Sequence, residues 1–137
     1  MPTPLYVETS AALRAVLEVG TTPGVEERIR AAEVLVTSRL SFVESARALL
    51  RVRRLAEVPE ARIADVEREL TSLWRHCHVW ELTPTVCDLA ERVAPHVPLR
   101  SLDALHLATF VLARRQVAGL ELLTADERLR EAAEGAT

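Results

Sequence analysis

Short apolar runs alternate with longer segments of helical periodicity along almost the whole chain, and this alternation limits the possible folds more than any other feature. Four runs of about four residues are typical of buried strands. The segments between them place apolar residues three or four positions apart, the spacing of one helical face. Strands separated by helices form parallel sheets covered on both faces. The sequence therefore predicts a single α/β domain over residues 1–137, with a central parallel sheet of about four strands flanked by helices.

Turn and capping residues set the expected boundaries of these segments. Gly20–Gly24 is typical of a turn, and Gly119 ends the most apolar helix. Pro59 and Pro84 suit the first turn of a helix. The expected strands are Leu5–Glu8, Val34–Thr37, Val79–Leu82 and Leu120–Leu123, and the expected helices are Thr9–Val19, Val25–Ala32, Ser38–Leu55, Pro59–Arg75, Thr83–Val93, Ser101–Gln116 and one that begins at Thr124.

Composition excludes several classes of protein. A formal net charge of -3 does not fit a globally basic nucleic-acid binder, so any contact with a polyanion must be local. All 17 basic residues are arginines, which excludes P-loop nucleotide sites and Schiff-base chemistry because both need a lysine. Two cysteines make no disulfide framework, and we find no signal peptide and no apolar run that could span a membrane. We therefore expect a cytoplasmic protein.

Four carboxylates fall where expected strands end or the following helices begin. Glu8 ends the first strand, Glu44 lies near the start of the helix after the second, Asp103 lies in the first turn of the apolar helix, and Asp126 follows the last strand. The carboxyl ends of parallel strands meet at one edge of a sheet. Carboxylates that converge there are costly without a cation, and oxygen ligands suit Mg²⁺ or Mn²⁺.

Helix capping is the alternative explanation for each acid taken singly. Ser41–Glu44 and Thr124–Glu127 both fit a capping box, and Asp103 in a first helical turn would complement the helix dipole. Capping explains any one of these residues at least as well as a site does. The four together favour a site.

Four motifs carry a resemblance to a known family. They are Tyr6-Val7-Glu8-Thr9-Ser10-Ala11, Ser41-x-x-Glu44, Leu102-Asp103-Ala104-Leu105-His106-Leu107-Ala108 and Leu123-Thr124-Ala125-Asp126-x-x-Leu129. In this order they cover nearly the whole chain, which resembles a PIN-domain ribonuclease, in particular a VapC-like toxin of a type II toxin–antitoxin system. The resemblance implies RNA cleavage dependent on Mg²⁺ or Mn²⁺, a cognate antitoxin as partner, and frequent homodimers.

The resemblance also assigns roles to residues. It implies that Glu8, Asp103 and Asp126 are metal ligands and that Glu44 completes the catalytic set. In the family mechanism, water activated by the metal attacks the phosphorus in line and leaves a 5′-phosphate and a 3′-hydroxyl. Polar groups that support the ligands or contact phosphate would be Thr9, Ser10 and Thr124.

The first acid departs from the family pattern, because relatives usually have aspartate where this chain has Glu8. The extra methylene moves the carboxylate by roughly 1.5 Å, a large offset for an ion with ligand distances near about 2.1 Å. A second hypothesis therefore stays open. The chain could be a non-catalytic PIN-fold module that binds RNA or a partner protein.

Arginines and one histidine complete the list of candidates. Arg47, Arg51 and Arg54 lie at helical spacing from Glu44, and would form either a track for RNA phosphates or a solvated face with local ion pairs. Further RNA-binding candidates are Arg14 and Arg100. We expect His106 to be a core histidine bonded to a backbone carbonyl, with a proton shuttle as the alternative.

Two long helices appear more apolar than one sheet can cover. The helix after Thr37 has an apolar side with Val43, Ala46, Leu49 and Leu50, and the helix after Pro59 has one with Ile63, Val66, Leu70 and Leu73. An excess of apolar surface on these helices would favour a dimer or a groove for an antitoxin.

Overall fold

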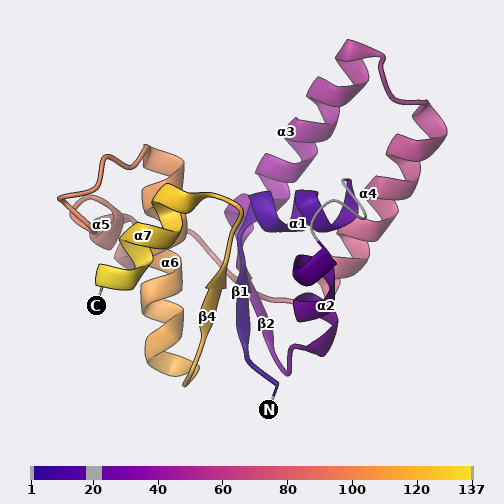
Figure 1. The fold of residues 1–137 in the computed structure, drawn as a ribbon. Helices are drawn as coiled ribbons and strands as arrows, with labels where there is room; N and C mark the ends of the chain where they lie inside the picture. Colours follow the sequence, from indigo (N-terminus) through magenta and orange to yellow (C-terminus); the bar gives the residue numbers. More distant parts are fainter. Residues whose placement is uncertain (1, 18–22, 137) are drawn as a thin grey trace.

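Four parallel strands form one sheet in the order β3–β2–β1–β4 in the computed structural model, which describes residues 2–17 and 23–136 (Figure 1). The central strand β1 pairs with β2 on one side and with β4 on the other, and β2 pairs with β3. The predicted parallel sheet is therefore confirmed. The strands are β1 (Leu5–Val7), β2 (Leu35–Ser38), β3 (His78–Trp80) and β4 (Glu121–Leu123).

The helices agree with the predicted order and differ at their ends. The first strand stops at Val7 and the last helix starts three residues later than expected, because Glu8 and Asp126 are the N-caps of the helices that follow. The expected turn at Gly20–Gly24 and the end of the first expected helix lie largely outside the described residues. The helices are α1 (Thr9–Val16), α2 (Pro23–Ala31), α3 (Arg39–Leu55), α4 (Glu60–Arg75), α5 (Pro84–Ala90), α6 (Ser101–Gln116) and α7 (Glu127–Gly135).

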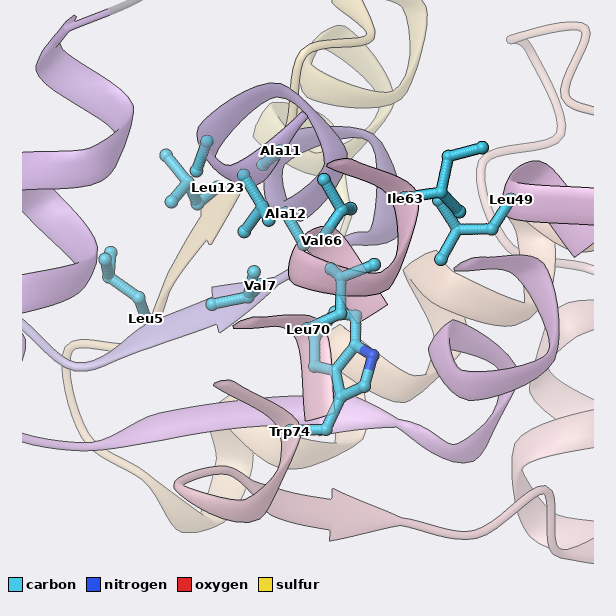
Figure 2. Packing of buried hydrophobic residues seen from close by; sticks show 12 residues of the cluster. Leu5, Val7, Ala11, Ala12, Leu49, Ile63, Val66, Leu70, Trp74 and Leu123 are labelled. Atoms are coloured by element: carbon cyan, nitrogen blue, oxygen red, sulfur yellow. The ribbon is translucent and has the colours of Figure 1, made fainter. Parts of the chain in front are cut away.

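Helices cover both faces of the sheet, with α1 to α4 toward one side and α5 to α7 toward the other (Figure 1). Successive side chains of a strand point to opposite faces, so Leu5 and Val7 belong to the first core and Tyr6 to the second. Figure 2 shows the first core, where residues of α1 and α4 pack beside Val7. The second core joins β1 and β2 to α6 and α7.

The apolar side of α3 is only partly buried. Leu49 is buried as expected, but Val43 is 56% exposed and Leu50 is 45% exposed. Part of this apolar side is therefore left uncovered, as the expected excess of apolar surface predicts, because α3 and α4 form a hairpin that extends past the sheet (Figure 1). The buried residues of α3 are Leu40, Ser41, Ser45, Ala48 and Leu49.

Among the described helices, none has the length and apolar character needed to cross a membrane.

Candidate active site

Glu8 stands at the carboxyl end of β1 and caps helix α1. Its Oε2 accepts a hydrogen bond from the backbone N–H of Ser10 at 2.9 Å. Its Oε1 accepts hydrogen bonds from the hydroxyl of Thr124, at 2.6 Å, and from the hydroxyl of Ser10. The residue is only 6% exposed. Three protein donors therefore hold this buried carboxylate in place.

Ser10 and Thr124 connect the ends of the two neighbouring strands β1 and β4. The Oγ of Ser10 accepts a hydrogen bond from the N–H of Ala125 at 2.9 Å, and the Oγ1 of Thr124 accepts one from the N–H of Asp126 at 3.0 Å. The parallel register that pairs Val7 with Leu123 brings these segments together. The two hydroxyls thus tie Glu8 to the segment that carries Asp126.

Glu44 reaches the same edge of the sheet from helix α3. Its Oε1 accepts hydrogen bonds from Thr9 Oγ1 and from His106 Nε2, both at 2.6 Å. Partial burial would raise the pKa of Glu44, but the hydrogen bonds from His106 and Thr9 outweigh it and leave this pKa below its usual value. Ser38, rather than Ser41, caps α3, so the capping-box explanation of Glu44 is wrong.

His106 lies beneath Glu44 and is 1% exposed. Its Nδ1 is 2.8 Å from the Oη of Tyr6, and its Nε2 is 2.6 Å from Glu44 Oε1 and 3.3 Å from Thr9 Oγ1. The prediction of a core histidine is confirmed. The predicted backbone carbonyl partner is wrong, because both ring nitrogens face side chains.

Asp103 and Asp126 occupy the starts of α6 and α7. Asp126 Oδ1 accepts hydrogen bonds from the N–H groups of Arg128 and Leu129, at 2.9 and 3.2 Å, so capping α7 does not occupy Oδ2. Thr124 is not the cap, and the capping-box explanation of this segment is therefore wrong. Burial raises the pKa of Asp103, and the negative charges of Asp126 and Glu8 raise it further. Like charges thus gather at this edge.

A pocket of about 860 Å³ opens between the starts of α6 and α7. Its lining includes Glu44, Asp103 and Asp126, but not Glu8, which is buried. Among the described residues, one group of ligand atoms lies within 4.8 Å of one another and could hold a metal ion: Glu8, Glu44 and His106. Of the predicted ligands Glu8, Asp103 and Asp126, only Glu8 belongs to this group. A donor set dominated by carboxylate oxygens fits a hard divalent cation such as Mg²⁺ or Mn²⁺.

The predicted RNA-binding arginines fall at three places. Arg100 lines the pocket, Arg14 is exposed on α1, and α3 carries the exposed Arg47, Arg51 and Arg54. Sequence reasoning missed a further arginine of the pocket, Arg128. The sequence did contain a signal for Arg128. A positive charge in the first turn of a helix is unfavourable to the helix dipole, so an arginine at this position suggests a function other than helix stability.

Comparison with known proteins adds evidence of common ancestry. The PIN domain family model matches residues 5–135. Ribonuclease VapC45 of Mycobacterium tuberculosis (strain CDC 1551 / Oshkosh) is 33% identical over 104 residues, which make up 76% of this chain and 71% of that protein. Ribonuclease VapC49 of M. tuberculosis (strain ATCC 25618 / H37Rv) matches with the same identity and coverage.

Solved structures share the fold. PAE2754 from Pyrobaculum aerophilum superposes with a TM-score of 0.68 at 25% identity, over 98% of this chain and 82% of that one. A toxin–antitoxin complex from Klebsiella pneumoniae gives a TM-score of 0.61 at 16% identity, with coverage of 89% and 86%. VapBC2 from Rickettsia felis, bound to a DNA fragment of its promoter, gives 0.57 at 8% identity, with coverage of 90% and 99%. The last two comparisons bear on the fold alone.

Proposed function

The chain belongs to the PIN-domain family, and we propose that it is a metal-dependent RNA endonuclease that acts as the toxin of a toxin–antitoxin pair. The observation that carries this proposal is the acidic pocket lined by Glu44, Asp103 and Asp126, with the buried Glu8 close enough for its charge to act on Asp103. The relatives named Ribonuclease VapC support RNA as the substrate. A protein of this kind would act in the cytoplasm.

The residues of the pocket have separate tasks in this proposal. Mg²⁺ or Mn²⁺, when bound, would supply positive charge for the scissile phosphate and activate water for hydrolysis. Asp103, Asp126 and Glu8 would hold the ion, and Glu44 would complete the catalytic set. Arg100 and Arg128 flank the acids and would bind RNA phosphates on either side of the cut. The hydroxyls of Ser10 and Thr124 hold Glu8 rather than contact RNA.

Cleavage of RNA by the purified protein tests the proposal directly. Mixed-sequence single-stranded RNA should be cut with Mn²⁺ or Mg²⁺ and left intact with EDTA. Asp103→Ala and Asp126→Ala should each lower the rate by at least about 100-fold, because each removes a carboxylate from the pocket. A matched control is Asp88→Ala on the exposed surface of α5, which should cut RNA at the wild-type rate. Equal cleavage by all four proteins would contradict the assignment.

A non-catalytic module that binds RNA or a partner protein is the second candidate. The observation in its favour is that both oxygens of Glu8 already accept hydrogen bonds from the protein. Titration with Mn²⁺ separates the two candidates, because a module needs no ion and a nuclease must bind one at millimolar concentration or below. If Glu8→Asp gains metal binding and cleavage that the natural protein lacks, the module is the correct description.

Exposed apolar side chains on α3 point to a protein partner. Val43, Leu50 and Leu55 are 56%, 45% and 66% exposed, and a pocket of about 320 Å³ lies between α3 and α4. Apolar side chains gathered on one element mark association surfaces. We propose that the α3–α4 hairpin binds the cognate antitoxin or a second copy of the chain.

A further inference from the structure

Two polar rings, Tyr6 and His106, are buried between β1 and α6. Tyr6 is 0% exposed on the central strand β1, and His106 is 1% exposed on α6. Their ring centroids are 6.0 Å apart at an interplanar angle of 82°, and Phe110 packs against Tyr6 from the next turn of α6. Polar groups at this depth are costly unless they are bonded. Tyr6 and His106 satisfy each other through the 2.8 Å contact between Oη and Nδ1.

Donors and acceptors can be arranged along this contact in a consistent order. A tyrosine keeps its proton at neutral pH, because a free phenol titrates only near about 10. With Tyr6 as donor, Nδ1 of His106 accepts. A neutral imidazole whose Nδ1 has no proton carries its proton on Nε2. This nitrogen lies 2.6 Å from Glu44 Oε1. The order is therefore Tyr6 O–H to Nδ1, then Nε2–H to Glu44.

The order has a consequence for the pocket. Glu44 is a long side chain on α3 and would otherwise sample several rotamers. The hydrogen bonds from His106 and Thr9 both end on Oε1, so this network leaves Oε2 unused at the pocket. Glu44 therefore keeps one oxygen available toward the pocket, beside the carboxylates of Asp103 and Asp126. The pocket thus keeps the negative potential that a cation needs.

We propose that Tyr6 and His106 are positioning residues, in which Tyr6 fixes the Nε2–H form of His106 and this imidazole orients Glu44. The inference rests on the proposed function, because orientation matters only if Glu44 acts in cleavage. Helix α6 makes the arrangement possible. Asp103 and His106 are three residues apart, so one turn supplies an acid to the pocket and a support beneath it.

Nuclear magnetic resonance tests the proton arrangement without RNA or metal. In ¹⁵N-labelled protein treated with EDTA at neutral pH, long-range ¹H–¹⁵N correlations report which ring nitrogen carries the proton. The His106 signals are those that disappear in His106→Gln and persist in His96→Gln, a change in an exposed loop. We expect a bare Nδ1 and a protonated Nε2, and we expect Tyr6→Phe to shift Nδ1. A protonated Nδ1 in the natural protein would overturn the proposed order.

Cleavage of single-stranded RNA with Mn²⁺ tests the positioning role. Glutamine places an amide N–H close to the position of Nε2, whereas leucine has no donor. His106→Leu should lower kcat by about 10-fold or more with KM changed less than about 2-fold, and His106→Gln should recover most of the loss. Circular dichroism and the melting temperature identify any variant that fails to fold, and Tyr6→Phe then provides the same comparison with a smaller change.

The two proposals fail in different ways. If the natural protein cuts no RNA with either metal, the proposed function is wrong, whatever the histidine spectrum shows. If it cuts RNA while folded His106→Leu and His106→Gln lose the same amount of kcat, only the positioning role is wrong.

Discussion

At the scale of single residues, Glu8 raises the question of what a glutamate does where relatives of the family usually have aspartate. Its longer side chain turns back over the start of α1 and accepts hydrogen bonds from Ser10 and Thr124. The carboxylate is thereby both a cap of α1 and a link between the ends of β1 and β4. The extra methylene therefore has a structural use, whether or not the oxygen atoms also reach a metal ion.

Glu8→Gln should destabilise the fold because it replaces one accepting oxygen with a donor. One of the three present donors then faces an N–H₂ group inside the protein. We expect the free energy of unfolding to fall by about 1–3 kcal/mol. Urea denaturation measures the change, with Glu57→Gln at an exposed position as the control. Equal stability of the two variants would show that the hydrogen bonds to Glu8 contribute little.

Asp103→Asn should stabilise the metal-free protein. Because folding raises the pKa of Asp103, the folded state favours the protonated form, and ionisation above this pKa costs stability. Removing the charge should raise the free energy of unfolding at pH 7 by about 0.5–1 kcal/mol. The gain should shrink as the pH falls through the raised pKa, since the natural aspartic acid is then neutral as well.

Thermal melts in EDTA between pH 4 and 7 measure this effect. Asp88→Asn, the same change at an exposed position of α5, should leave the melting curves unchanged. A melting temperature that falls at pH 7 in Asp103→Asn would contradict the repulsion inferred between Asp103 and its neighbours Asp126 and Glu8.

At the scale of elements, helix α6 buries its apolar residues, whereas the α3–α4 hairpin leaves several of its apolar residues exposed. The middle of α6 is buried nearly all round, from His106 to Val111, and it positions the site. Helix α3 buries only one side, and its exposed Val43 and Leu50 lie on a hairpin that extends from the body (Figure 1). A helix that keeps apolar side chains in water is typical of an association surface.

Leu50→Asp should abolish association without unfolding the chain. The side chain is 45% exposed, so its replacement should change stability by no more than about 0.5 kcal/mol. Light scattering reports the mass of the protein alone, and co-purification reports binding to the product of the neighbouring reading frame. Leu82→Asp, at a site that is 38% exposed and lies outside the hairpin, should keep the mass of the natural protein and its binding to the product of the neighbouring reading frame. If the two variants behave alike, the hairpin is not the association surface.

At the scale of the whole molecule, four segments far apart in sequence bring negative charge to one edge of the sheet, at Glu8, Glu44, Asp103 and Asp126. Repulsion among these charges is tolerated because capping bonds hold Glu8 and Asp126, and side-chain donors hold Glu44. A bound cation would relieve it. The fold is therefore expected to gain stability from the ion that its site uses.

Mn²⁺ should raise the melting temperature of the natural protein. A ligand that binds only the folded state stabilises it by about 2.7 kcal/mol at a concentration 100-fold above its dissociation constant. Asp126→Asn should lose most of this gain and still fold, because asparagine also caps helices well. Glu57→Gln should keep the full gain. An unchanged melting temperature at 10 mM Mn²⁺ would count against metal binding, and with it against the nuclease.

The sequence by itself determined the order of strands and helices, the parallel sheet and the positions of the four acids along the chain. Local periodicity and capping residues carry that information, because they act within one or two turns. Element ends were less well determined: Glu8 and Asp126 cap helices through side-chain bonds that spacing does not reveal, and α5 ends at Ala90 rather than Val93.

Only the tertiary structure decided which side chains meet. The partners of His106 lie 100 and 62 positions away, at Tyr6 and Glu44, and no periodicity predicts such contacts. The exposed face of α3 was likewise decided by how far the hairpin extends past the sheet. Whether an apolar side chain is buried depends on which other parts of the chain pack against it. The local sequence pattern shows only that the residue is apolar.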